Sequence, residues 1–81
     1  MYLSKHSAYF RIPNLGGDHG SKTIKQNLDS IHGVISVSVN LTSNKVAVDY
    51  DSTGTNSEKL KEEIQKSGFE AQLIADDNHV M

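Results

Sequence analysis

The sequence of 81 residues predicts a ferredoxin-like α+β sandwich, in which a four-stranded antiparallel sheet carries two helices on one face. Two observations predict this class. Apolar and polar residues alternate in four segments, as in strands with one buried face, and apolar residues recur at spacings of three and four in two others, as in amphipathic helices. The segments follow one another as βαββαβ, and right-handed crossovers then bring both helices to the same face of the sheet.

The first half of the chain contains a strand, a glycine-rich loop and a helix. Residues 8–12 alternate between apolar and polar, which predicts the strand. Three glycines between Leu15 and Gly20 predict the loop, because glycine adopts backbone angles that other residues avoid. In the segment 21–31 the apolar residues stand four and three positions apart, which predicts a helix that ends near Gly33.

The second half begins with a hairpin and a second helix. Residues 35–41 and 46–50 alternate on either side of a turn in which Asn44 tolerates a left-handed conformation. The segment Thr55–Glu58 matches a capping box, in which a threonine and a glutamate side chain satisfy the first free amides of a helix. The second helix is therefore expected to start there, and Gly68 is expected to end it.

A fourth alternating segment, residues 69–73, predicts the last strand and closes the predicted domain at residues 8–74. The segments 1–7 and 75–81 show no periodicity and are expected to be flexible tails. The inward-facing apolar residues of the six elements are expected to form one core. They are Phe10, Ile12, Leu15, Ile24, Leu28, Ile31, either Val34 or Ile35, Val37, Val39, Val46, Val48, Leu60, Ile64, Phe69, Ala71 and Leu73.

Charge and composition exclude several classes of function. Eight basic residues against ten acidic ones give a net charge of -2, so neither nucleic acid nor a membrane surface is an expected partner. No apolar run approaches the roughly 20 residues of a membrane-spanning helix, and the start lacks the apolar stretch of a signal peptide, so a cytoplasmic location is expected. The absence of cysteine excludes disulfides, thiolate metal sites and cysteine nucleophiles. No nucleophile–base pair or cofactor signature occurs, and we expect a monomer that is not an enzyme.

Several short motifs occur in the order and spacing of a known family. They are Ile12–Leu15 (IPNL), Ile24 and Leu28, Gly33–Val34, Val37–Leu41 (VSVNL), Val46–Asp51 (VAVDYD) and Gly68–Phe69. Across residues 8–74 the chain resembles the heavy-metal-associated domain, which is found in copper chaperones and at the N-termini of metal-pumping ATPases. The resemblance implies the ferredoxin-like fold, a role in metal-ion binding or transport, and a metal-transporting ATPase or a related domain as partner.

The chain departs from this family at the metal-binding loop. Family members carry Gly-Met-Thr-Cys-x-x-Cys before the first helix, and the two thiolates bind a soft ion such as Cu(I). When Ile24 is matched to the isoleucine of the family's helix, the two cysteine positions fall on Gly17 and Gly20, which offer no side-chain donor. Leu15 replaces the methionine conservatively. The resemblance thus implies a domain of the copper-chaperone type that has lost its thiolate site, and cysteines at both positions are expected to restore soft-metal binding on an intact framework.

Asp18 and His19 lie between the two former cysteine positions and are the candidate donors that remain. A carboxylate and an imidazole suit Zn(II), Ni(II), Co(II) or Cu(II) better than Cu(I), and His6 could add a third donor to this weak site. Alternatively, Asp18 caps the first helix through its side chain and His19 is an exposed loop residue. The alternative function is a metal-free, degenerate domain that acts as a protein-interaction or regulatory module.

Overall fold

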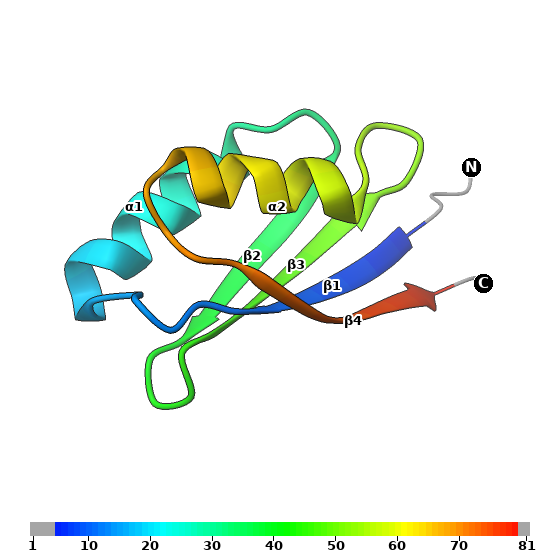
Figure 1. Cartoon of the computed structure of the whole chain (residues 1–81). Coiled ribbons are helices and arrows are strands. Elements are labelled where there is room, and N and C mark those ends of the chain that lie inside the picture. The colour runs from blue at the N-terminus through cyan, green and yellow to red at the C-terminus, as the bar shows by residue number, and fades with distance from the viewer. Residues whose placement is uncertain (1–4, 80–81) are drawn as a thin grey trace.

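All six predicted elements are present in the structure, a computed structural model that describes residues 5–79. They are β1 (Lys5–Arg11), α1 (Gly17–Asp29), β2 (Val34–Asn40), β3 (Lys45–Asp51), α2 (Ser57–Lys66) and β4 (Gln72–His79). The strands form one sheet in the order β2-β3-β1-β4, and every neighbouring pair is antiparallel. Both helices lie on one side of this sheet (Figure 1), which confirms the predicted ferredoxin-like class.

The two terminal strands extend past the predicted limits of the domain, 8–74. β1 begins at Lys5 and β4 continues to His79, and these two residues lie opposite each other in the ladder. Residues 5–7 and 75–79, which the sequence placed in flexible tails, are therefore strand residues. Backbone hydrogen bonds extend the ladder there, and they leave no apolar periodicity in the sequence. The rest of the predicted tails lies outside the described residues.

The first helix begins earlier than its apolar spacing predicts. α1 starts at Gly17, inside the predicted loop, instead of at Ser21, and it ends at Asp29 instead of near Gly33. Its N-cap is Gly16, with a φ of 77° and no capping hydrogen bond from a side chain. Gly17 has a φ of 75°. Only glycine adopts the left-handed conformation without strain. Two successive residues in this conformation turn the chain from the loop into the helix.

The second helix has the predicted ends with one change of cap. Asn56, not Thr55, caps α2, because the Asn56 side chain accepts a hydrogen bond of 2.8 Å from the amide of Lys59. Gly68 follows the helix with a φ of 91°, as predicted for a left-handed residue at this place. Residues 69–71, predicted as the start of the last strand, instead form the connection to β4.

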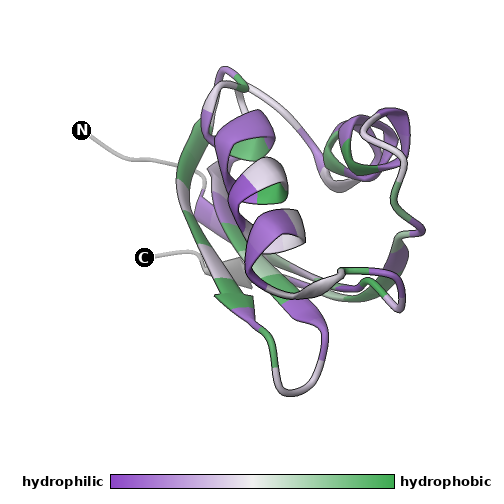
Figure 2. Cartoon of the chain, turned by 90° about the vertical axis from the view of Figure 1, so that its left-hand side faces the viewer, coloured by the Kyte–Doolittle hydropathy of each residue, from purple (hydrophilic) through white to green (hydrophobic). Residues whose placement is uncertain are grey.

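The core lies between the sheet and the two helices. Each helix carries a hydrophobic stripe beside hydrophilic residues (Figure 2), so that the apolar side of each helix can be buried. The buried apolar residues are Ala8, Phe10, Ile12, Leu15, Ile24, Leu28, Val37, Val46, Val48, Tyr50, Leu60, Ile64 and Ala71, with Ile31, Val34, Val39 and Phe69 partly buried against them.

One expected core residue, Leu73, is exposed, and of the two alternatives Val34 and Ile35 it is Val34 that packs against the core. Ile35 is 46% exposed because the register between β2 and β3 shifts between Val34 and Ser36, which turns Val34 inward and leaves Ile35 as the extra residue of a bulge. Leu73 is 42% exposed on β4, where only one neighbouring strand flanks it. Tyr50 was not expected in the core, but it continues the inward alternation of β3 and is only 2% exposed.

Candidate metal-binding loop

The segment that joins β1 to the first turn of α1 exposes the two candidate donors. Asp18 and His19 are exposed in the first turn of α1, whereas Leu15 and Gly20 are buried. Asp18 does not cap the helix through its side chain, which corrects the alternative interpretation of this residue. Its carboxylate lies in the first turn, where a negative charge interacts favourably with the helix dipole.

Gly20 is in close contact with the backbone of the loop. A Cβ atom at this position would lie 1.5 Å from the carbonyl oxygen of Leu15 and 2.7 Å from its carbonyl carbon. It would also lie 3.3 Å from the ring of Phe69. At Gly17, by contrast, a Cβ atom would meet nothing within 4 Å. The expectation that cysteines at both positions fit an intact framework is therefore wrong for Gly20, because the Leu15 carbonyl occupies the place that a side chain needs.

Asn14 ties the loop to the chain segment that follows α2. Its side-chain amide donates a hydrogen bond of 3.3 Å to the carbonyl of Gly68, and its side-chain oxygen accepts one of 2.8 Å from the amide of Glu70. One side chain thus satisfies both a donor and an acceptor of the connection to β4. These two hydrogen bonds hold the loop against the connection to β4.

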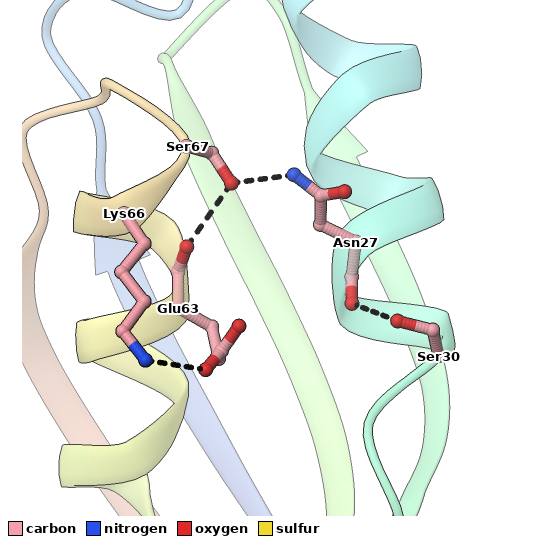
Figure 3. Close-up of polar contacts among 5 residues, drawn as sticks. All are labelled: Asn27, Ser30, Glu63, Lys66 and Ser67. Atoms are coloured by element: carbon pink, nitrogen blue, oxygen red, sulfur yellow. Dashed lines mark hydrogen bonds and ion pairs between the residues drawn. The ribbon is translucent and has the colours of Figure 1, made fainter.

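A polar contact also joins the two helices to each other (Figure 3). The side-chain amide of Asn27 in α1 donates to the hydroxyl of Ser67, which in turn donates a hydrogen bond of 3.0 Å to the carbonyl of Glu63 in α2. The end of α2 is therefore fixed against α1 as well as against the loop.

His6 does not join Asp18 and His19, contrary to the suggestion that it could supply a third donor. It lies near the start of β1, while the loop follows the other end of this strand (Figure 1). Its ring stacks on Tyr50 with centroids 5.4 Å apart, and its Nδ1 atom lies 3.7 Å from Asp76 Oδ1.

Tyr50 and Asp76 complete this cluster at the start of β1. The Tyr50 hydroxyl donates to the Asp76 carboxylate, with distances of 2.9 and 3.0 Å to its two oxygens. Burial and the nearby carboxylate raise the pKa of Tyr50 to about 12. No sequence pattern indicates this contact, because Asp76 lies in a segment without periodicity.

The loop lacks the thiolate donors of a soft-metal site. The chain contains no cysteine, and among residues 5–79 no group of three or more histidine, aspartate or glutamate side chains is arranged to hold an ion. The donor set does not fit a soft ion such as Cu(I), which prefers thiolates. Within the same residues, no helix is both long and apolar enough to cross a membrane.

Comparison with known proteins shows what this framework is related to. The model of the heavy-metal-associated domain matches residues 9–70. A copper chaperone CopZ from Staphylococcus haemolyticus is 32% identical over 59 residues, which cover 73% of this chain and 87% of the relative. A second CopZ, from Staphylococcus epidermidis, is 28% identical over 60 residues, which cover 74% of this chain and 88% of that protein.

Solved structures agree with these sequence matches. The N-terminal domain of a potential copper-translocating P-type ATPase from Bacillus subtilis, in its Cu(I)-loaded state, superposes with a TM-score of 0.84 at 25% identity, covering 95% of this chain and 96% of that one. A copper-binding domain from HMA7, a P-type ATPase, gives a TM-score of 0.83 at 28% identity, covering 88% and 96%. The chain therefore belongs to the heavy-metal-associated domain family.

Proposed function

We propose that this chain is a non-catalytic heavy-metal-associated domain that acts in metal-ion trafficking through protein contact and does not itself carry a soft metal ion. The close approach of Leu15 to Gly20 is the observation that supports this most directly. Position 20 lacks a donor and also lacks the space for one. A site that needs two converging thiolates is removed when either position is closed.

The relatives indicate the class of partner. They include copper chaperones and a domain of a copper-translocating ATPase, so we propose a metal-transporting ATPase or a related domain that has kept its cysteine pair. The loop would contribute to such a contact through the exposed side chains of Asp18 and His19 and through its fixed backbone. A loop that is already ordered loses little conformational entropy on binding, which favours recognition by shape.

The test measures metal and partner binding on the same isotope-labelled protein. In competition with a strong Cu(I) chelator, the protein is expected to retain no copper. Addition of a cysteine-bearing CopZ-type domain, with and without Cu(I), is expected to shift the amide signals of residues 14–20. Stoichiometric copper retained against the chelator would contradict the proposal, and so would the absence of any shift with such domains.

Titration with Zn(II) and Ni(II) separates this function from weak metal binding. Saturable shifts confined to Asp18 and His19, abolished by His19→Ala but not by His32→Ala, would favour a weak site for borderline ions instead. His32 is a matched control because it is also exposed but lies beyond the other end of α1.

A further inference from the structure

The edge strand β2 carries no charged residue. In the sheet order β2-β3-β1-β4 it pairs with β3 on one side, and no strand of the described residues lies beyond it. Its seven residues, Val34–Asn40, include four aliphatic β-branched ones and neither proline nor glycine. Edge strands usually carry charges or proline, which prevent pairing with another chain. This strand therefore has the composition of a strand that accepts a partner.

The opposite edge of the sheet differs in charge. β4 contains the carboxylate of Asp76, so two copies paired through β4 would bring like charges into one interface. Like charges facing each other across a strand pair are destabilising, and each chain already has a net charge of -2. Pairing of two copies through β2 brings no charged pair together. Charge therefore favours β2 over β4 as the surface for self-association.

We infer that β2 is a self-association surface, on which the β2 strand of a second copy of this chain pairs in antiparallel orientation. From Ser36 to Asn40 the ladder with β3 is free of register shifts, so this segment is the regular part of the edge. Centred on Ser38, the pairing sets Ser38 against its counterpart and Val37 against Val39 of the other copy. The product is a continuous sheet through both copies, closed by a twofold axis.

Charge placed at the centre of this pairing tests it. Ser38 is exposed, so Ser38→Lys leaves the core of each copy intact but sets two lysines against each other at the axis. Wild-type protein is expected to show a reversible monomer–dimer equilibrium by sedimentation between micromolar and millimolar concentration. Ser38→Lys should raise the dimer dissociation constant by about two- to fivefold. The matched control Gln72→Lys, at an exposed position on β4, should leave it unchanged.

A charge swap distinguishes pairing at β2 from a general loss of stability. Ser38→Glu should weaken self-association as Ser38→Lys does, and a mixture of the two variants should form a heterodimer, because lysine then faces glutamate. Far-UV circular dichroism checks that each variant is folded. Three results would each overturn the inference: a wild-type protein that stays monomeric over the whole range, association that Ser38→Lys leaves unchanged, or a mass that keeps growing and is blocked by Gln72→Lys, since this indicates head-to-tail pairing of β2 with β4.

Discussion

Replacement of Gly20 by alanine tests the packing on which the proposed function rests. The added methyl group would lie 1.5 Å from the carbonyl oxygen of Leu15, where real Cβ atoms keep at least 3.0 Å from such neighbours. The methyl carbon and the carbonyl oxygen must therefore move apart by 3.0 minus 1.5, or 1.5 Å. The group that has to move is backbone, and the Leu15 side chain attached to it is fully buried. The movement therefore disturbs the core as well as the loop.

The expected loss of stability follows from overpacking. Extra methylene groups in a well-packed core usually cost about 1 to 3 kcal/mol, and a backbone obstacle places Gly20→Ala at the upper end, at about 3 kcal/mol. A domain of 81 residues has a free energy of unfolding of about 4 to 12 kcal/mol. The variant would thus lose a large share of its stability.

The assay is urea denaturation followed by far-UV circular dichroism, with Gly17→Ala as the matched control. At Gly17 a methyl group meets nothing within 4 Å, and the cost is that of a left-handed residue at a φ of 75°, about 1 to 2 kcal/mol. Gly20→Ala should therefore be the less stable of the two. The reasoning would be refuted if Gly20→Ala lost less free energy of unfolding than Gly17→Ala.

Three further substitutions test other parts of the fold. Leu28→Ala should lower the free energy of unfolding by about 2 to 5 kcal/mol, because Leu28 is fully buried; a loss below about 1 kcal/mol would contradict its place in the core. Asn14→Ala removes both hydrogen bonds to residues 68–70 and should cost about 1 to 3 kcal/mol in urea denaturation, with faster amide exchange in that segment. Tyr50 has its pKa raised to about 12 from 10.0. The unfolded chain releases this proton first, so stability is complete below pH 10 and is lost as the pH rises toward 12. Tyr50→Phe should flatten this alkaline loss, and an unchanged pH profile would show that ionisation of the buried Tyr50 hydroxyl does not contribute to it.

The parts of the fold that sequence predicts are those in which side-chain burial alternates regularly. Val46 and Val48 in β3, and Ile24 and Leu28 in α1, are buried as their spacing predicts. The ends of β1 and β4 could not be predicted in this way, because polar residues there are held by backbone hydrogen bonds that leave no pattern in the sequence. The inward side of β2 was ambiguous for a related reason, since a bulge at Ile35 interrupts the period of two.

The N-cap residue of α2 could not be predicted from the sequence for a different reason. Thr55 and Asn56 both belong to the residue types that cap helices, so composition alone could not choose between them. In the structure Asn56 accepts the capping hydrogen bond, while Thr55 is 6% exposed and its hydroxyl has no partner among the described residues. Thr55 is buried, and Asn56 is the capping residue. Which of the two is buried depends on how the whole chain folds, so the local sequence does not show it.

The two glycines of the candidate site lack different things, and only one of these was visible in the sequence. Gly17 lacks a donor but has space around it, whereas Gly20 lacks both a donor and space, because the Leu15 carbonyl lies where a Cβ atom of residue 20 would be. Both thiolates of a metal site must converge on one ion, so restoring a cysteine at Gly17 alone cannot rebuild it. Asn14 meanwhile fixes the same loop through hydrogen bonds that need no ligand. Tight Cu(I) binding by a double cysteine variant would therefore require this loop to adopt a different conformation.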